Sequence, residues 1–441
     1  IPPNFNSALY YRHITKWAEQ VVLPAEAPAA MRRAFTQVRN GRPRPALVEF
    51  PADVLVEEIA DPLVYRPVAA SRTAPDPRAV DEVAEVLVGA RQPVVYAGQG
   101  VHYARAWEAL RELAEWLGAP VTTSLEGKSA FPETHPLSLG SGGRSIPKPV
   151  HHFLQRCDVI FGIGCSFATT HYGVSMPPGK VMIHATLDPA DVNKDVPADH
   201  VLLGDAGLTL EALVEAVKDR VGEPRRDQAA KTAREIAAVR GEWLEQWMPK
   251  LVSDEVPLSP YRVIWDLLHT VDVSNTIITH DAGSPRDQLS PFWQAQAPLS
   301  YIGWGKTTQL GYGLGLAMGA KLEAPGKLCV NVWGDAAIGF TGMDFETAVR
   351  ERIPILSVLL NNSSMAIELP VMPVATQKYR STDISGHYAA LAQALGAYGE
   401  RVSDPGEIVP AIRRAVRKTQ EGTPALLEFI TAQEIEFSLF K

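Results

Sequence analysis

The sequence predicts an α/β protein made of several doubly wound parallel-sheet domains. Short apolar runs of strand length, such as "PVVYAG" at 93–98 and "KVMIHATL" at 180–187, alternate with amphipathic helical patterns. Apolar strands that alternate with helices are typical of parallel sheets buried on both faces. At 441 residues the chain is also too long for one hydrophobic core, which favours two to four domains.

Three blocks follow one another along the chain. Residues 1–60 hold one helical pattern and the strand-like run "PALVEFPADV", which indicates the closing part of an α/β domain. A proline-containing linker leads to residues 76–222, where strand-like and helical runs alternate as in a complete doubly wound sheet. A polar helix over 223–256 bridges to residues 257–441, in which "TIITHD", "LCVNVWGD", "PILSVLLNN" and "PALLEFITA" repeat the strand pattern.

Composition excludes several classes of function. The formal net charge is −8 and no long block of Lys and Arg occurs, which argues against a nucleic-acid partner. No apolar run approaches the roughly 18 residues that span a bilayer. Because no charged-then-apolar leader precedes the first block, we expect a cytoplasmic protein without a membrane partner. The three cysteines lie in or beside apolar runs, where reduced thiols are expected rather than disulfides.

Polar side chains end two successive predicted strands in the third block. Asp335 ends "KLCVNVWGD", and Asn362 ends "PILSVLLNN" 27 residues later. If these strands are neighbours in a parallel sheet, both side chains lie at its carboxyl edge, where their oxygens suit Mg²⁺. Ala336 and Ala337 are small enough to let backbone N–H groups approach a diphosphate. The alternative is that Asp335 caps a helix and the two asparagines form a turn.

The Gly-Asp pair at 334–335 followed by the double Asn at 361–362 resembles the signature of thiamine diphosphate enzymes. Within their acetolactate synthase-like superfamily, "GDAAIGFTGMDFETAVRERIPILSVLLNN" (334–362) and "LGYGLGLAMGA" (310–320) look most like 2-hydroxyacyl-CoA lyases and oxalyl-CoA decarboxylases. The resemblance to the superfamily extends over essentially the whole chain. It implies a thiamine diphosphate-binding fold in which residues 1–60 close a pyrimidine-binding domain, 76–222 form a Rossmann-like central domain, and 257–441 form the diphosphate-binding domain.

The resemblance also implies a cofactor site. Asp335 and Asn362 would bind Mg²⁺ through their side chains and Ser364 through its backbone carbonyl, although the family usually has glycine at the last position. Leu310 matches the apolar residue that keeps the cofactor bent, and its alternative is a plain core leucine. The residues implied to contact thiamine diphosphate are Gly283, Ser284, Leu310, Gly334, Asp335, Ala336, Ala337, Asn362, Ser364 and Met365.

Glu368 is the candidate catalytic residue. It follows Asn362 by six residues, where some 2-keto acid decarboxylases carry a catalytic glutamate and the lyases carry no acid. A carboxylate desolvated beside the cofactor could shuttle protons, whereas a solvated helix glutamate is the alternative. The family's activating glutamate lies earlier in the pyrimidine-binding domain than residues 1–60 reach. We therefore expect that this sequence is a fragment or that another chain supplies that residue.

The central block carries weaker signals. Gly98 and Gly100 in "YAGQG" fit either a nucleotide loop or a tight turn. Ser166 in "GCSF" replaces an arginine that FAD-binding acetolactate synthases have, which makes FAD doubtful. Arg144 and Lys148 are candidates to meet the phosphates of CoA, with a solvated surface as the alternative.

These observations lead to three hypotheses about function. The first is a 2-hydroxyacyl-CoA lyase that cleaves a CoA thioester to formyl-CoA and an aldehyde or ketone, with the reverse carboligation. The second is an acetolactate synthase-like enzyme or 2-keto acid decarboxylase. The third is a catalytically silent structural or regulatory subunit. In each enzyme the partner is a small-molecule substrate, and the resemblance implies a homodimer or homotetramer.

Overall fold

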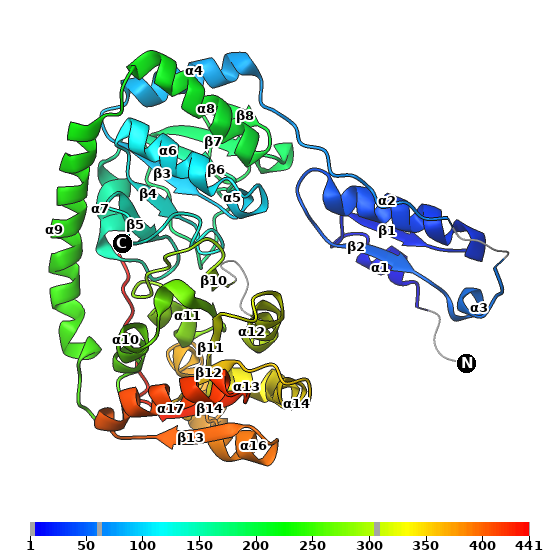
Figure 1. The fold of residues 1–441 in the computed structure, drawn as a ribbon, viewed down its shortest axis with the longest axis vertical. Coiled ribbons are helices and arrows are strands. Elements are labelled where there is room, and N and C mark those ends of the chain that lie inside the picture. The colour runs from blue at the N-terminus through cyan, green and yellow to red at the C-terminus, as the bar shows by residue number, and fades with distance from the viewer. Residues whose placement is uncertain (1–4, 60–63, 304–308, 441) are drawn as a thin grey trace.

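The computed structural model describes residues 5–59, 64–303 and 309–440, which form three parallel-sheet α/β units (Figure 1). The three sheets have the strand orders β1-β2, β5-β4-β3-β6-β7-β8 and β10-β9-β11-β12-β14-β13. Every pairing between these named strands is parallel. The fold class expected from the sequence is therefore confirmed.

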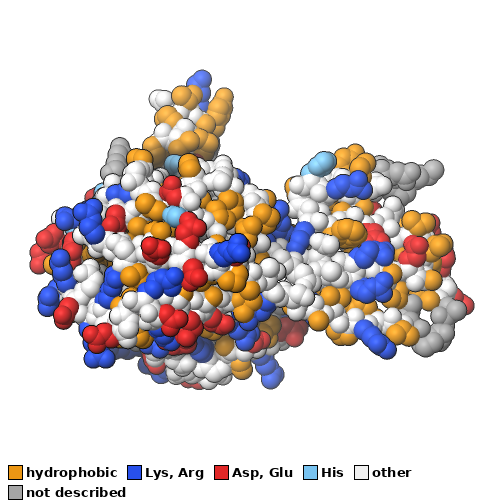
Figure 2. Space-filling view, turned by 90° about the horizontal axis from the view of Figure 1, so that it is seen from above, with side chains coloured by type: hydrophobic (Ala, Val, Ile, Leu, Met, Phe, Trp, Pro, Cys, Tyr) orange, Lys and Arg blue, Asp and Glu red, His pale blue; other side chains and the backbone are white. Residues whose placement is uncertain are grey.

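The first unit is built on two strands. Its elements are α1 (Ser7–Tyr11), β1 (Trp17–Gln20), η1 (Pro24–Glu26), α2 (Ala27–Arg39), β2 (Ala46–Glu49) and α3 (Ala52–Leu55). Its buried hydrophobic cluster contains Val21, Ala30 and Val54. Figure 2 shows this unit as a separate lobe with hydrophobic side chains on its surface. Tyr10 and Ile14 are among its exposed hydrophobic residues.

The central unit is a six-stranded sheet. Its strands are β3 (Pro93–Ala97), β4 (Val121–Thr123), β5 (Ser138–Ser141), β6 (Val159–Ile163), β7 (Val181–Thr186) and β8 (His200–Leu203). Its helices are α4 (Pro77–Gly89), α5 (Gly100–Tyr103), α6 (Trp107–Leu117), α7 (Lys148–Arg156), η2 (Pro189–Asp191) and α8 (Ala206–Val221). The sequence predicts β3, β4, β6 and β7 but misses β5 and β8, the two edge strands, which have only four residues each.

The chain reverses its direction of travel through the central sheet between the neighbouring strands β3 and β6. The loops that follow these strands cross closely: the N–H of Gly98 donates to the carbonyl of Ile163 at 2.8 Å. A Cβ atom on Gly98 would lie 2.3 Å from the carbonyl oxygen of Gly164. Gly98 is therefore needed for a close approach of two backbones.

A long helix, α9 (Arg226–Leu251), connects the central and third units along one side of the molecule (Figure 1). It is the polar helix expected over 223–256, and its Trp243 and Trp247 pack into the core of the third unit. None of the helices in the described ranges is long and apolar enough to cross a bilayer.

The third unit is a second six-stranded sheet covered on both faces. Its strands are β9 (Thr276–His280), β10 (Tyr301–Ile302), β11 (Leu328–Gly334), β12 (Leu356–Asn361), β13 (Tyr398–Val402) and β14 (Ala425–Ile430). On one face lie α10 (Pro260–Thr270) and α17 (Ile408–Gln420), and the other face packs against α12 (Tyr312–Glu323), α13 (Asp335–Thr341), α14 (Phe345–Arg350) and α16 (Tyr388–Ala394). The remaining elements are α11 (Ser284–Leu289), α15 (Pro373–Tyr379), η3 (Val273–Asn275), η4 (Gly342–Asp344), η5 (Ala366–Glu368) and η6 (Pro405–Glu407).

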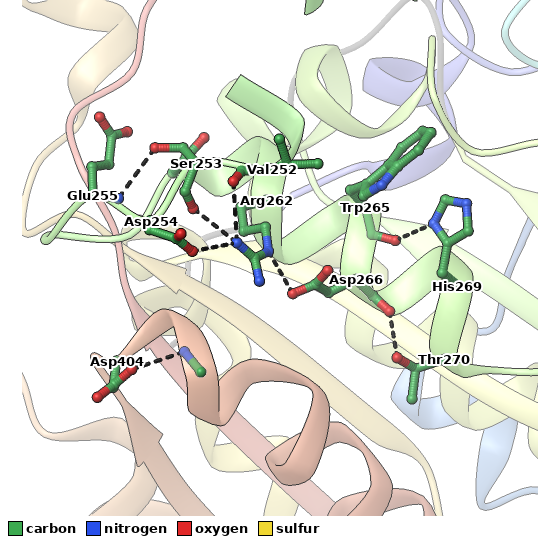
Figure 3. Close-up of polar contacts among 12 residues, drawn as sticks. Val252, Ser253, Asp254, Glu255, Arg262, Trp265, Asp266, His269, Thr270 and Asp404 are labelled. Carbon is green, nitrogen blue, oxygen red and sulfur yellow. Dashed lines mark hydrogen bonds and ion pairs between the residues drawn. The ribbon is translucent and has the colours of Figure 1, made fainter. Parts of the chain in front are cut away.

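Arg262 fixes the turn by which α9 enters the third unit (Figure 3). Its guanidinium donates to the carboxylates of Asp254 at 2.9 Å and Asp266 at 2.7 Å, and to the carbonyl of Ser253 at 3.1 Å. One side chain thus joins the loop after α9 to the first turns of α10.

Glu133 of the central unit forms a buried ion pair within that unit and hydrogen bonds to the third unit. Lys128 lies 2.5 Å from Glu133, and both side chains are almost fully buried. Glu133 also accepts a hydrogen bond from the N–H of Ala295 at 2.8 Å, and its own N–H donates to the carbonyl of Ala295 at 2.8 Å. The two units are therefore connected by hydrogen bonds at Glu133 as well as by apolar packing.

Candidate cofactor site

The edge formed by β11 and β12 brings the two predicted metal ligands together. These strands are parallel neighbours in which Gly334 lies opposite Leu360. The N–H of Ser364 donates to Asp335 Oδ2 at 3.1 Å and to Asn362 Oδ1 at 3.0 Å. The two side-chain oxygens therefore converge on one point, as the sequence predicts for a shared ligand.

The carboxylate of Asp335 lies in an environment that disfavours its charge. Asp335 is 4% exposed, and burial raises the pKa of its carboxyl group to about 6. Backbone N–H donors, those of Ser364 and Ala336 first, oppose this shift, and no cation of the described chain takes part. An incompletely compensated buried carboxylate costs free energy, so a bound cation would stabilise it.

The chemistry of the donor set fits Mg²⁺. A carboxylate, a carboxamide oxygen and a backbone carbonyl are all hard oxygen donors, and Mg²⁺ usually completes its six ligands with water and phosphate oxygens. The described residues contain no group of three His, Cys, Asp or Glu side chains that could hold a metal ion. A site completed by a bound diphosphate does not need such a group.

The two adjacent asparagines point in different directions. Asn361 Nδ2 donates to Glu428 Oε1 at 2.8 Å, away from the oxygen that Asn362 presents beside Asp335. Glu428 lies in the middle of β14 and is fully buried. The sequence alone does not mark Glu428 as a site residue, because one acidic residue inside an apolar run does not show what it contacts.

The loop that carries Leu310 is fastened by Asp281. The carboxylate of Asp281 is fully buried and accepts hydrogen bonds from the N–H groups of Gly311 at 2.9 Å and Gly313 at 3.1 Å. Thr341 in α13 donates to the carbonyl of Gly311 at 2.7 Å. Leu310 therefore lies at a fixed point between α12 and α13, partly buried against the hydrophobic cluster of that face. The sequence alone does not reveal this role of Asp281, although the residue ends the strand-like run "TIITHD".

The turn before α11 faces the end of β11. Gly283 has a φ of +85° and precedes the first residue of α11, Ser284, which is buried. A Cβ atom on Gly334 would lie 3.7 Å from the side chain of Pro285. Pro285, which directly follows Gly283 and Ser284, therefore lies beside Gly334, the residue before α13.

Glu368 lies close to the metal-ligand candidates in the chain and is not fixed by other charges. It ends the short helix η5, which follows Ser364 and Met365 directly, and it is half-buried. The N–H of Met365 donates to the carbonyl of Thr382 at 2.8 Å, which anchors this segment. Within the described chain no hydrogen bond or ion pair engages the Glu368 carboxylate, which leaves it available to a ligand.

The two residues predicted to meet CoA are engaged with other protein groups. Lys148 lies 3.0 Å from Glu242 in α9, and Arg144 lies 3.7 Å from Asp287 with its guanidinium 5.7 Å from the ring centre of Phe437. They lie between the central unit and its neighbours. Neither residue lines the large cavity of the central unit.

That cavity has a volume of about 990 Å³ and opens at the carboxyl ends of β3, β6 and β7. Its lining includes Gly100, Ser166 and Asp188, together with Arg42 from the first unit and Arg72 from the linker. The ion pairs Arg42–Asp191 and Arg44–Asp188 connect the first and central units at this place. The cavity is separate from the edge at Asp335 and Asn362, since neither residue lines it.

Two protein families match the chain. The thiamine pyrophosphate enzyme central domain matches residues 80–213, and the C-terminal TPP binding domain of the same enzymes matches residues 281–429. The second match contains the whole Asp335–Asn362 edge. Neither match indicates FAD.

Curated relatives and a solved structure agree with these families. The chain is 29% identical to a probable acetolactate synthase large subunit of Methanocaldococcus jannaschii, over 95% of the chain and 71% of the relative. It is 27% identical to the acetolactate synthase isozyme 3 large subunit of Escherichia coli, over 93% of the chain and 72% of the relative. Its fold is similar to that of the benzoylformate decarboxylase from Polynucleobacter necessarius, with a TM-score of 0.77, 20% identity, and coverage of 96% of this chain and 77% of that one.

These relatives do not support the narrower resemblance drawn from 310–320 and 334–362. They are acetolactate synthases and a decarboxylase, so they favour the second hypothesis over a 2-hydroxyacyl-CoA lyase and give no support to a CoA thioester substrate. Short motifs around the cofactor are shared by enzymes with different substrates, which explains why they indicated the superfamily and not the subtype. With both its central and its cofactor-binding domain matched, the chain belongs to the thiamine pyrophosphate-dependent enzymes.

Proposed function

We propose that the protein is an acetolactate synthase-like enzyme that uses thiamine diphosphate and Mg²⁺ to decarboxylate a 2-keto acid and join the remaining fragment to a second carbonyl compound. The convergence of the Asp335 and Asn362 oxygens on the N–H of Ser364 carries the proposal. The substrate class is drawn from the relatives that are acetolactate synthases.

The residues of the third unit have separate tasks in this proposal. Asp335, Asn362 and the carbonyl of Ser364 bind Mg²⁺, whose charge offsets the cost of burying the Asp335 carboxylate. The backbone at Gly283, Ser284, Gly334, Ala336 and Ala337 would bind the diphosphate. Leu310 and Met365 border the cofactor, and Asp281 keeps the Leu310 loop in place.

The bound cofactor would supply the nucleophilic carbon and the electron sink for breaking and forming the carbon–carbon bond. The protein would orient the keto acid, exclude water and move protons. Glu368 is the proposed proton carrier, because its carboxylate is half-buried and has no partner within the described chain that would compete for its proton.

The test compares two substrate classes on the complete natural polypeptide, loaded with thiamine diphosphate and Mg²⁺. Pyruvate and larger 2-keto acids are offered in one series and short 2-hydroxyacyl-CoAs in another, with products followed by chromatography and mass spectrometry. We expect carbon dioxide and an acetolactate-type product from the keto acids. Cofactor binding without turnover of either class would contradict the proposal and favour a silent subunit.

A 2-hydroxyacyl-CoA lyase is the second candidate. The Gly-Leu-Gly run at 313–315 and "GFTGMDFET" at 339–347 favour it, and the central cavity includes Arg42, Arg72 and Lys180, which suit the phosphates of a CoA-like ligand. Formyl-CoA from the thioesters alone would establish this candidate and overturn the keto-acid proposal.

A further inference from the structure

A charged side chain lies in the middle of a deeply buried strand of the third unit. Glu428 is fully buried in β14, between Leu427 and Phe429, which are also fully buried. A carboxylate persists at such a position only when hydrogen bonds compensate for its lost hydration. Glu428 Oε1 accepts from Asn361 Nδ2 at 2.8 Å, and Oε2 accepts from the N–H of Ala389 at 2.9 Å. The guanidinium of Arg401 lies farther off, at 4.0 Å.

The first of these bonds leads to the loop of the cation site. Asn361 ends β12, and its Oδ1 accepts from the N–H of Ser363 at 3.1 Å. Ser363 has a φ of +56°, a left-handed conformation that a non-glycine residue adopts at a cost. This residue turns the chain between Asn362 and Ser364 and so brings both of them to Asp335. The side chain of Asn361 stabilises that turn by accepting from the N–H of Ser363, and Glu428 orients the Asn361 side chain by accepting from its amide.

The second bond leads to Asp335 by another route. Ala389 belongs to the first turn of α16, whose first residue is Tyr388. The Tyr388 hydroxyl donates to the backbone carbonyl of Asp335 at 3.4 Å. Both carboxylate oxygens of Glu428 thus support the cation site. Oε1 acts through Asn361 on the loop that carries Asn362 and Ser364, and Oε2 acts through the start of α16 on Asp335.

We propose that Glu428 is a positioning residue for the cation site: it fixes Asn361 and the start of α16, and through them sets the spacing of the Asp335, Asn362 and Ser364 oxygens. The inference rests on the proposed function, because it requires a cation at that edge. It gives the two adjacent asparagines different tasks. Asn362 would bind the cation through its side-chain oxygen, whereas Asn361 connects Glu428 to the loop at Ser363 by hydrogen bonds.

The decisive variants exploit the direction of the Asn361–Glu428 hydrogen bond. Glu428→Gln can no longer accept from both partners, because its amide N–H₂ must face either Asn361 Nδ2 or the Ala389 N–H. Adding Asn361→Asp restores the bond with reversed direction: the amide introduced at position 428 would donate to the carboxylate introduced at position 361, which would still accept from Ser363. The total charge is that of the natural pair, so the double variant isolates the hydrogen bond. Glu400→Gln, on the neighbouring strand β13, is the control.

The measurement is the Mg²⁺ concentration that half-saturates thiamine diphosphate binding, followed by tryptophan fluorescence, with melting temperatures taken without Mg²⁺ and cofactor. Loss of an outer partner typically weakens metal binding by about 10- to 100-fold, and we expect this in Glu428→Gln. The double variant should recover most of the loss, and Glu400→Gln should bind as the natural protein does. If Glu428→Gln alone fails to fold, Asn361→Ser, which keeps Glu428, carries the same prediction.

Three outcomes separate the two proposals. An unchanged Mg²⁺ requirement in Glu428→Gln overturns the inference and leaves the proposed function standing. If Mg²⁺ binding is weaker in Glu428→Gln and the double variant does not restore it, the inference is also overturned, because Glu428 would then serve folding alone. If the natural protein shows no Mg²⁺-dependent cofactor binding, the proposed function and the inference fail together.

Discussion

Asp335 and Asn362, 27 residues apart in the chain, present their side-chain oxygens to the same backbone N–H, that of Ser364. Asp335 Oδ2 and Asn362 Oδ1 share this one donor, and Asp335 is a buried carboxylate whose other oxygen, Oδ1, accepts from the N–H of Ala336. Burying the charged carboxylate of Asp335 costs free energy, and a cation between the two oxygens would offset this cost.

The first prediction is a pH dependence caused by Asp335. Its pKa is about 6 in the folded protein, against an ordinary value of 3.8, so the group favours folding below pH 4 and loses this contribution as pH rises through 6. A pKa shift of this size changes the free energy of unfolding by at most about 3 kcal/mol. In metal-free protein, Asp335→Asn should therefore gain stability relative to the natural protein between pH 4 and 7. Melting temperatures across this range, without and with Mg²⁺, measure the difference, and a parallel pH profile for both proteins would contradict it.

The second prediction concerns the loop that Asp281 fastens. Asp281→Asn can accept through only one oxygen, so either Gly311 or Gly313 loses its acceptor. A lost hydrogen bond to a charged acceptor is worth about 1.5–3 kcal/mol, and we expect cofactor affinity to fall by at least about tenfold. Titration calorimetry measures this affinity. Asp272→Asn, which makes the same change at an exposed aspartate before the other end of β9, is the control, and equal affinities in the two variants would count against the role of Asp281.

The third prediction concerns the buried Lys128–Glu133 ion pair of the central unit, whose glutamate also hydrogen bonds to Ala295 of the third unit. Lys128→Met leaves Glu133 buried without its cation, which should destabilise the protein by about 3–5 kcal/mol. Adding Glu133→Gln removes the uncompensated charge and should recover part of the loss. Thermal unfolding of both variants tests this, and a double variant less stable than Lys128→Met would refute it.

The fourth prediction separates chemistry from binding at Glu368. Glu368→Gln keeps the size of the side chain but removes its ability to carry a proton, a step worth about 100- to 10,000-fold in rate. We expect kcat to fall within this range while cofactor affinity stays within a few fold. Glu351→Gln, which changes an exposed glutamate of the same unit, is the matched control. Unchanged turnover would remove Glu368 from the mechanism.

The sequence was informative where a pattern repeats and where chemistry depends on spacing. Buried strands such as β11 and β12 are continuous apolar runs, so they were predicted, and the residues at their ends followed from the geometry of parallel sheets. The edge strands β5, β8, β10 and β13 were missed because short or polar strands lack that pattern. The CoA prediction for Arg144 and Lys148 stays untested, and the structure gives both residues protein partners instead.

The supporting residues could not be predicted in the same way. Asp281 and Glu428 act through contacts with residues 30 or more positions away, at Gly311 and Asn361. A single sequence shows that an acidic residue stands in an apolar run, but not which backbone or side-chain donors meet it. Only the register of β12 against β14 places Asn361 beside Glu428.

The central claim is that Asp335 and Asn362 together bind the cation that holds thiamine diphosphate. Calorimetric titration of the cofactor into the complete natural polypeptide, with and without Mg²⁺, tests it most directly when repeated on Asp335→Asn. We predict that cofactor binding by the natural protein requires Mg²⁺. In Asp335→Asn the affinity should fall by more than about 100-fold, which exceeds the loss typical of removing a residue that only hydrogen bonds to a metal ligand. Equal binding by the two proteins, or binding that does not depend on Mg²⁺, would contradict the account.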